Sequence, residues 1–339
     1  MSVLLTRDVI TIGGSSGSTG VLKRILADLP TDLPASVLIT THVASQSAGL
    51  MGKMLMEGSN LLVAQAVDQQ AVERGHVYVA PPDRHLLIVD GVIRLGDGPR
   101  ENMARPAVDA LFRSVALSFG PRVIGVVLSG LLNDGAAGLH AIKSCGGIAV
   151  VQHPLDAEAD SMPLAALEAT AVDYVAAAAE MGALIAQIAG TKAGPGHPPS
   201  DELRLEVEIA AGARLGSANL RRLAEPSPLS CPDCGGVLSE MRGARPLRFR
   251  CQIGHAYTAD VLVAHSDKVD EAIRVAMRIM EERVTLVERM AADARDTGRH
   301  AVAELYAARF EEYRRYATTL RDAAISSSRL GNRKLEQDD

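Results

Sequence analysis

The sequence contains no tryptophan, and it has only four phenylalanines and six tyrosines among 339 residues. Few aromatic rings are therefore available as platforms on which nucleic-acid bases could stack. Positive charge is not in excess either, because 35 lysines and arginines face 41 aspartates and glutamates, which gives a formal net charge of -6. We therefore expect no large basic surface and no nucleic-acid partner.

Long apolar runs are also missing. No stretch reaches the roughly 18 consecutive apolar residues that a membrane-spanning helix needs, and the N-terminus lacks the basic, apolar and small-residue succession of a signal peptide. With 47% hydrophobic residues, the chain has the composition of a globular protein large enough for two domains. We predict a cytoplasmic protein without membrane insertion.

Residues 8 to about 190 alternate short β-branched runs with helical stretches. Such alternation is typical of an α/β fold, a doubly wound and mainly parallel sheet with helices on both faces. Residues 76–80, 85–89 and 92–95, separated by turn residues, predict a small antiparallel meander. The predicted parallel strands are 8–13, 36–41, 62–66, 122–129 and 148–152, and the predicted helices are 21–29, 106–118, 136–145, 165–170 and 180–188.

The C-terminal part has a different character. Residues 191–200, rich in proline and glycine, begin a predicted linker that extends to residue 230 and holds a possible-strand alternation at 203–210. A zinc-ribbon-like module at 231–258, an α-helical hairpin at 259–328 with its turn at Asp296-Thr297-Gly298, and a disordered tail at 329–339 are predicted to follow. The apolar stripes of the hairpin fit either packing of helix on helix or a surface for a partner or a second copy.

A glycine and serine run, Gly13-Gly14-Ser15-Ser16-Gly17, lies between an apolar segment and a helical one. It predicts a strand, a tight turn and a helix, because glycine permits backbone angles and close approaches that other residues do not. A serine in such a turn is held exposed where the strand ends. Ser15 is therefore the candidate nucleophile.

Loops that follow the carboxyl ends of parallel strands meet at one edge of the sheet. Ser15 follows the first predicted strand, His42 the second, and Asp134 the strand at 122–129. A serine needs an imidazole to take its proton, and that imidazole needs a carboxylate to fix its tautomer. We therefore expect a Ser-His-Asp hydrolase, in which backbone N–H groups of Ser16 and Leu131 face the developing oxyanion.

Parts of the sequence are also compatible with other classes of function. The glycine run also resembles the nucleotide loop of short-chain dehydrogenases, but Thr19 stands where that loop needs glycine, and no tyrosine is followed four residues later by lysine. A P-loop is excluded because Gly-Lys-Ser/Thr is absent. A non-catalytic receptor-binding or scaffold protein of the same fold stays open as the alternative to an enzyme.

Six motifs in order resemble those of CheB, the chemotaxis protein-glutamate methylesterase family, over about residues 7–190. They are Ile12-Gly13-Gly14-Ser15, Ile39-Thr40-Thr41-His42, GHVYVAPPDRH at 75–85, Arg105-Pro106-Ala107-Val108-Asp109, LSGLLNDGAAG at 128–138 and Ser161-Met162-Pro163.

The resemblance implies hydrolysis of glutamate methyl esters on the cytoplasmic helices of chemoreceptors, with release of methanol and, in many members, deamidation of receptor glutamines. It implies no cofactor for catalysis. Ser15, His42 and Asp134 match the family's triad, and Arg105 and Met162 lie in motifs near its substrate site. The chain departs from the family at Val43-Ala44, where Met-Pro is usual, and at Leu131-Leu132, where Met-Gly is usual, so we expect changes in loop conformation and substrate fit.

Family members usually carry an N-terminal receiver domain that blocks the site until it is phosphorylated. The first catalytic strand here begins near residue 8, so we expect no such control within this chain. We predict instead that the C-terminal module is a regulatory or docking module for a partner.

Three of the four cysteines are close together and have a histidine beside them. Cys231 and Cys234 form a CxxC pair, and Cys251 and His255 follow after a predicted hairpin. Four soft or borderline ligands at this spacing suit tetrahedral zinc and leave no open position, so a structural zinc site is predicted. The alternative is a small hairpin with buried free cysteines; the fourth, Cys145, is expected to be a packed core residue.

Overall fold

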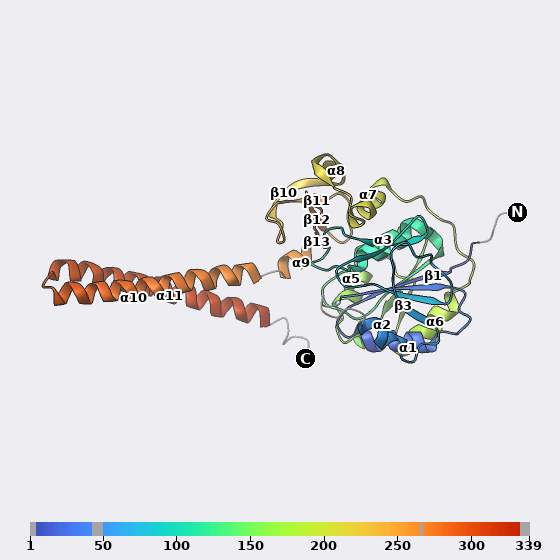
Figure 1. The fold of residues 1–339 in the computed structure, drawn as a ribbon, viewed down its shortest axis with the longest axis horizontal. Coiled ribbons are helices and arrows are strands. Elements are labelled where there is room, and N and C mark those ends of the chain that lie inside the picture. Colours follow the sequence, from blue (N-terminus) through green and yellow to red (C-terminus); the bar gives the residue numbers. More distant parts are fainter. Residues whose placement is uncertain (1–4, 43–49, 265–266, 333–339) are drawn as a thin grey trace. The chain divides into compact units, whose positions relative to one another are not determined.

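The computed structural model describes residues 5–42, 50–264 and 267–332, and the chain divides into two compact units, Met1–Leu262 and Val263–Asp339 (Figure 1). The first unit holds all the strands named below, and the second holds the two long C-terminal helices. The predicted boundary near residues 191–200 therefore does not separate the compact units.

The first unit is built on a seven-stranded sheet in the order β3-β4-β2-β1-β7-β8-β9. All neighbouring strands in it run parallel. The central strands are buried along their whole length, as expected for a parallel sheet with both faces covered. The strands are β1 Val9–Gly14, β2 Ser36–Thr41, β3 Leu62–Gln65, β4 His76–Val79, β7 Val123–Val127, β8 Ile148–Gln152 and β9 Tyr174–Ala176.

Helices cover both faces of this sheet, which confirms the predicted doubly wound α/β fold (Figure 1). One face carries α1 Ser18–Asp28, α2 Leu50–Met56 and α6 Ala178–Ile188. The other carries α3 Val108–Phe119, α4 Ala136–Ser144 and α5 Ser161–Ala169.

The predicted meander is wrong in one strand. Strand β4 lies inside the parallel sheet between β3 and β2, and only β5 His85–Val89 and β6 Val92–Gly96 pair as an antiparallel hairpin. The reason is burial on both faces: Val77 and Val79 pack into one hydrophobic core and Tyr78 into the other. Turn residues after β4 therefore end a core strand rather than reverse a hairpin.

The predicted strand at 203–210 is also wrong, because these residues form helix α7 Asp201–Ala210. Ser200 caps the helix, its Oγ accepting from the N–H of Leu203 at 3.2 Å. Glu206 is buried on the same face as Leu203 and Val207, and it pairs there with arginines of the next sheet. This long-range pairing selects the helical face over the local alternation.

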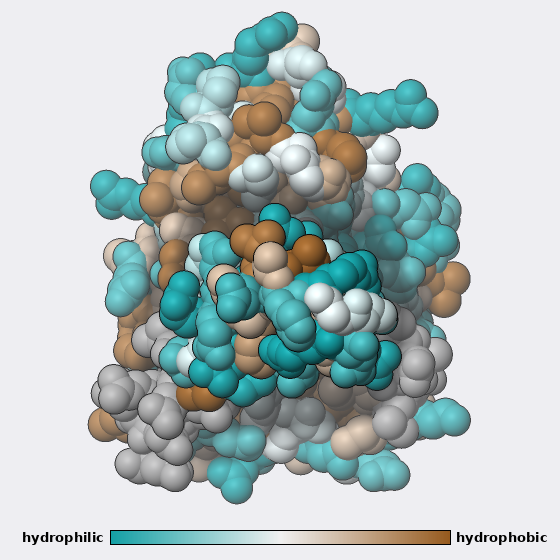
Figure 2. All heavy atoms as spheres, turned by 90° about the vertical axis from the view of Figure 1, so that its left-hand side faces the viewer, coloured by the Kyte–Doolittle hydropathy of each residue, from teal (hydrophilic) through white to brown (hydrophobic). Residues whose placement is uncertain are grey.

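Most of the rest of the predicted linker also forms regular elements, and only residues 193–200 and 213–215 have no assigned secondary structure. Helix α8 Gly216–Leu223 leads into an antiparallel sheet of β10 Ala224–Ser230, β11 Val237–Met241, β12 Arg248–Cys251 and β13 Ala256–Thr258. The predicted hairpin of the cysteine-rich module corresponds to β11 and β12. Figure 2 shows apolar side chains in the upper part of the face that is turned toward the viewer. Val237 of β11 and Ile253 of the turn between β12 and β13 are 61% and 59% exposed, and both line a cavity of about 660 Å³.

The second unit confirms the predicted helical hairpin. After the short helix α9 Ala259–Ala264, helices α10 Asp267–Asp296 and α11 His300–Asn332 pack against each other around a turn at 297–299. Val287, Ala291 and Ala317 of the predicted stripes are buried there. Helix α11 continues past the predicted end at 328, and residues 333–339 of the predicted tail lie outside the described residues. Among the described helices, none combines the length and the apolar character that crossing a membrane requires.

Candidate active site

The turn after β1 holds Ser15 at the carboxyl edge of the sheet. Strand β1 ends at Gly14, and Gly17, with a φ of 75°, caps helix α1. The N–H of Ser15 donates to the carbonyl of Ser129 at 2.9 Å, and its carbonyl accepts from the hydroxyl of Ser18 at 2.7 Å. Both backbone groups of Ser15 are thereby held, and its half-buried side chain projects from the strand end.

His42 lies between the other two predicted residues. Its Nδ1 is 3.1 Å from Ser15 Oγ, and its Nε2 is 2.7 Å from Asp134 Oδ2. A carboxylate only accepts, so Nε2 carries the proton and Nδ1 is left as the acceptor for the serine hydroxyl. The ring faces the serine through Nδ1, the reverse of the serine proteases in which Nε2 does so. The tautomer is nevertheless the one that proton abstraction needs.

Asp134 is buried beneath this pair at the N-terminus of α3. Its Oδ2 also accepts from the N–H of Val108 at 2.7 Å, and its Oδ1 accepts from the N–H of Asp109 at 3.0 Å. Burial alone would raise the pKa of Asp134, but hydrogen bonds from His42 and from these two N–H groups outweigh it and lower the pKa. The N-terminus of a helix thus keeps the carboxylate ionised.

Close packing brings the helix to the strand end. A β-carbon added to Gly13 would lie 2.1 Å from Cγ1 of Val108, so only glycine allows α3 to start this close to β1. The glycine run therefore helps to position the carboxylate of Asp134, through the start of α3, as well as Ser15.

The surroundings of His42 raise the basicity of its imidazole. Burial would lower the pKa of His42, but the hydrogen bond and the charge of Asp134, with a contribution from Asp109, raise it above 6.5. The electrostatics therefore favour the imidazolium that would form when Ser15 gives up its proton.

Two predicted oxyanion donors lie in the loops beside Ser15. Over the described part of the chain, the backbone N–H groups of Ser16 and Leu131 have no protein acceptor. Leu132 adopts a φ of 63° in the same loop, and the side chains of Leu131 and Leu132 are 55% and 38% exposed. Within the described residues, the N–H groups of Ser16 and Leu131 are therefore free to bind an oxyanion. The exposed side chains of Leu131 and Leu132 lie in the same loop.

The two other predicted site residues, Arg105 and Met162, form hydrogen bonds within the catalytic domain. Arg105 donates to Asp83 Oδ1 at 2.8 Å and to the carbonyl of Gly98 at 3.0 Å. Met162 is fully buried, and its N–H donates to the carbonyl of Gly130 at 2.9 Å. Contact of either residue with substrate stays a prediction.

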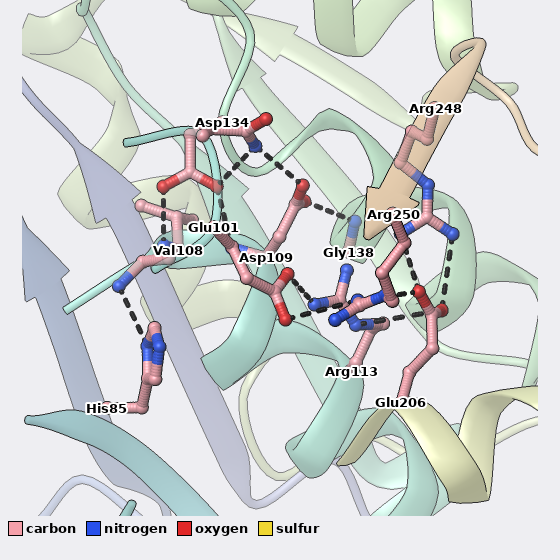
Figure 3. A network of polar contacts seen from close by, with 12 residues as sticks. His85, Glu101, Val108, Asp109, Arg113, Asp134, Gly138, Glu206, Arg248 and Arg250 are labelled. Carbon is pink, nitrogen blue, oxygen red and sulfur yellow. Dashed lines mark hydrogen bonds and ion pairs between the residues drawn. The ribbon is translucent and has the colours of Figure 1, made fainter. Parts of the chain in front are cut away.

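A second buried carboxylate, Asp109, is not among the predicted site residues (Figure 3). Its Oδ1 accepts from the N–H of Gly135 and of Gly138 at 3.0 and 2.6 Å. Burial, with the charge of Asp134, raises the pKa of Asp109 to about 7. The side-chain amide of Asn102 lies between the two acids, 3.2 Å from Asp109 and 3.3 Å from Asp134. The motif at 105–109 signals Asp109, but nothing local signals Asn102.

A buried cluster of charges lies behind these acids and was also missed (Figure 3). Glu101 pairs with Arg113 of α3 and with Arg250 of β12, the latter at 3.3 Å. Glu206 of α7 joins Arg250 at 3.1 Å and Arg248 at 2.8 Å. The cluster therefore links the four-stranded sheet and α7 to the helix that holds Asp134.

His85 is a structural histidine of the same region (Figure 3). Its Nε2 donates to the carbonyl of Pro99 at 3.0 Å, and its Nδ1 accepts from the N–H of Ala107 at 3.2 Å. Burial lowers its pKa, so it stays neutral and satisfied at both nitrogens.

The predicted metal ligands come together at the two turns at one end of the four-stranded sheet, between β10 and β11 and between β12 and β13. The ligand atoms of Cys231, Cys234, Cys251 and His255 all lie within 4.8 Å of one another. The Sγ atoms of Cys234 and Cys251 are 3.7 Å apart, and Nδ1 of His255 is 3.5 Å from Cys251 Sγ. Ligands about 2.3 Å from a tetrahedral zinc are separated by roughly 3.8 Å. The donor set and its spacing fit zinc.

The family described as CheB methylesterase matches residues 10–185. A Leptospira interrogans protein, provisionally named protein-glutamate methylesterase/protein-glutamine glutaminase, is 41% identical over 169 residues, which cover 50% of this chain and 88% of its own. A protein of that name from Hydrogenovibrio crunogenus is 38% identical over 171 residues, covering 49% of this chain and 45% of its own.

Among solved structures, the catalytic domain of the Thermotoga maritima CheB methylesterase matches with a TM-score of 0.52 and 28% identity, over 54% of this chain and 99% of that domain. The family match ends at residue 185. The four-stranded sheet, the metal cluster and the helical hairpin therefore lie outside it.

Proposed function

The chain belongs to the CheB methylesterase family of carboxylic ester hydrolases, and we propose that it hydrolyses glutamate methyl esters on chemoreceptors. We assign Ser15 as nucleophile, His42 as general base and Asp134 as the residue that orients His42. One observation carries the assignment: a continuous hydrogen-bonded chain joins Ser15 Oγ to the imidazole at 3.1 Å and the imidazole to the carboxylate at 2.7 Å.

The chemistry follows from this chain of hydrogen bonds. Ser15 Oγ attacks the ester carbonyl while His42 Nδ1 takes its proton, and Asp134 stabilises the imidazolium that forms. The N–H groups of Ser16 and Leu131 stabilise the oxyanion, each contributing about 3 kcal/mol. His42 then gives this proton to the departing methoxide oxygen, so that methanol leaves and an acyl-enzyme forms. A water that the same histidine deprotonates then hydrolyses the acyl-enzyme.

The same site would accept a glutamine side chain, with ammonia as the leaving group in place of methanol. The glutaminase named in the relatives' double name supports this second reaction. The alternatives of a scaffold protein and of a nucleotide-binding oxidoreductase are not favoured by the family match.

Release of methanol from methylated receptor membranes tests the proposal. We expect Ser15→Ala to abolish release, because no other group replaces the attacking oxygen, while thermal unfolding stays near that of the wild type. Ser144→Ala is the matched control, because Ser144 is exposed on α4 and its hydroxyl bonds only the carbonyl of His140. Methanol release by Ser15→Ala at the wild-type rate would refute the assignment.

We also infer that Cys231, Cys234, Cys251 and His255 hold a structural zinc ion. Four protein ligands fill the tetrahedral shell and leave no position for water or substrate. Tyr257 supports the site from outside, its hydroxyl 3.6 Å from Cys231 Sγ and donating to Asp233 at 2.6 Å. Reduced cysteines without metal are the alternative.

The proposed substrate implies where in the cell the enzyme acts. Methylated glutamates on the cytoplasmic helices of chemoreceptors require the enzyme to act in the cytoplasm, which is therefore part of the proposal. A regulatory partner bound through the C-terminal module stays a prediction from the sequence.

A further inference from the structure

Strand β13 of the four-stranded sheet pairs with a loop of the catalytic domain. The N–H of Asn102 donates to the carbonyl of Ala256 at 2.8 Å, and the N–H of Thr258 donates to Asn102 Oδ1 at 3.1 Å. The N–H of Ala256 reaches back to the carbonyl of Arg100 at 3.3 Å. The sheet thus holds both the backbone and the side chain of Asn102.

The loop that it holds is a tight turn of unfavourable conformation. Asn102 and Met103 have φ values of 48° and 64°, between reciprocal backbone hydrogen bonds of Glu101 and Ala104. Asparagine tolerates this left-handed region, whereas the side chain of methionine disfavours it. The conformation needs support from its surroundings, and β13 supplies it.

The amide of Asn102 has a fixed orientation because of this pairing. Its oxygen accepts from Thr258, so its nitrogen must face the acids, where it bridges Asp134 Oδ1 at 3.3 Å and Asp109 Oδ2 at 3.2 Å. A rotated amide would place an oxygen against two carboxylates. The contact with β13 therefore selects the orientation that restrains Asp134.

A second contact reaches the residue next to Asp134. The fully buried hydroxyl of Thr258 donates to Asn133 Oδ1 at 2.6 Å, and Asn133 Nδ2 donates to Asp260 at 2.7 Å. Both polar atoms of the Asn133 side chain are thus taken up by residues at the end of β13 and the start of α9. The Asn133-Asp134 loop is held from the C-terminal side.

We propose that strand β13 is a positioning element of the active site, in which Thr258 acts through Asn102 and Asn133 to hold Asp134 against His42. The proposal deepens the proposed function and rests on its triad. It makes the four-stranded sheet a required part of the catalytic apparatus, although none of the hydrogen bonds of β13 among the described residues reaches Ser15. The metal ligand His255 directly precedes β13, so the metal cluster lies at the start of the strand that does this positioning.

The alternative is that β13 only stabilises the docking of the four-stranded sheet on the catalytic domain. The buried charge cluster of Glu101, Arg250 and Glu206 already joins the two. If β13 had only this stabilising role, removal of the Thr258 hydroxyl would lower the free energy of unfolding and leave the pKa of His42 unchanged.

The basicity of His42 is a readout that a purely structural role would not move. A less well-held Asp134 supports the imidazolium less, so the pKa of His42 should fall. Among the described residues, the charged or titratable groups that face His42, Asp134 or their direct neighbours are Asp109, His85, Arg113, Arg248 and Asp260. None of these groups, and neither His42 nor Asp134, is altered in the variants below.

The test uses two independent variants of the full chain. Thr258→Val removes the hydroxyl at nearly constant volume, and Asn102→Gly removes the amide while keeping a residue that adopts positive φ without strain. Thr258→Ser retains the hydroxyl. Thr11→Val is the matched control, because Thr11 is equally buried and its Oγ has no partner within the described residues.

Two measurements are made on each variant: the rate at which a fluorophosphonate labels Ser15 as a function of pH, and the titration of His42 by NMR. Thr258→Val and Asn102→Gly should each lower the labelling rate about tenfold or more, as expected for a misplaced catalytic group. Both should shift the acid limb and the NMR midpoint of His42 to lower pH. Thr258→Ser and Thr11→Val should stay close to wild type.

An unchanged His42 midpoint in folded Thr258→Val and Asn102→Gly would overturn the proposal, even if labelling slows. Thermal unfolding identifies a variant that does not fold, and the other variant then decides. A wild-type chain that the phosphonate does not label would refute the nucleophile, whereas the NMR midpoint would still decide whether β13 positions Asp134.

Discussion

Gly130 lies so close to Met162 that a β-carbon on residue 130 would be 2.1 Å from the Met162 Sδ and 2.9 Å from Cβ of Ser15. The N–H of Gly130 donates to Ala159, and its carbonyl accepts from Met162. The buried methionine thereby wedges the loop after β7 against the serine. This contact explains why Met162 belongs to the site region without being exposed.

Gly130→Ala should therefore displace Ser15. Overpacking of this kind costs about 1–3 kcal/mol of stability, and a displacement of about 1 Å at a catalytic group lowers the rate on the order of 100-fold. Methanol release and thermal unfolding measure the two effects. Gly20→Ala is the control, since a β-carbon there meets nothing within 4 Å; wild-type activity in Gly130→Ala would show that the serine tolerates the shift.

The raised pKa of His42 sets the pH dependence of activity. The imidazole must be neutral to accept the serine proton, so activity should fall as the pH drops through a pKa above 6.5. Asp134→Asn should move this acid limb to lower pH and reduce kcat by about 10⁴-fold, the loss seen when a triad carboxylate is replaced by its amide. A pH profile of kcat/KM that is the same in both proteins would contradict the assigned role of Asp134.

The pairing of His42 with Asp134 also makes the free energy of unfolding depend on pH. The folded pKa of His42 lies above its unfolded value, so its contribution is fully present below pH 6.5 and is lost as the pH rises through the folded pKa. Asp134→Asn should remove this component from the curve of unfolding free energy against pH.

Glu101 is the central acid of the buried charge cluster. Burial would raise its pKa, but the charges of Arg113 and Arg250 lower it, so it is ionised. Glu101→Gln leaves both guanidinium groups short of a counter-charge and should cost about 3–5 kcal/mol of unfolding free energy in a denaturant titration. Glu240→Gln, at an exposed position of β11, should change it by less than about 0.5 kcal/mol. An equally small change for Glu101→Gln would mean that the cluster does not hold the sheet.

Metal content tests the zinc proposal. Purified protein should contain one zinc per chain, and Cys234→Ser should lose it, because three ligands bind far more weakly than four. A chelator should lower the unfolding temperature of the wild type but not that of Cys234→Ser. Cys145→Ala, which alters a buried cysteine of the catalytic core, should keep its metal. Wild-type protein without metal and insensitive to the chelator would favour reduced cysteines.

Several features follow from local sequence because short-range physics decides them. The glycine turn before α1 needs residues without a β-carbon, and buried parallel strands such as β1 and β7 need continuous apolar runs. The spacing of Ser15, His42 and Asp134 after three strands places them at one edge once the sheet is parallel. The CxxC pair with Cys251 and His255 likewise predicts a metal site from spacing alone.

Other features depend on partners far away in the chain. The turn residues 81–84 are compatible both with a hairpin of β4 and β5 and with a β4 that ends in the parallel sheet. Burial of β4 on both faces decides for the parallel sheet. The alternation at 203–210 fits a strand, until the pairing of Glu206 with Arg248 and Arg250 selects a helix.

The sequence by itself determined the α/β class, the three strand ends that carry the serine, histidine and aspartate, and the helical hairpin, because each depends on periodicity or spacing within a short segment. Only the tertiary structure decided that the four-stranded sheet docks on the catalytic domain. Asn102 and Thr258 are 156 residues apart, and no local pattern records a hydrogen bond between them. Such a contact exists only when two surfaces that are distant in sequence meet and bury their polar groups together.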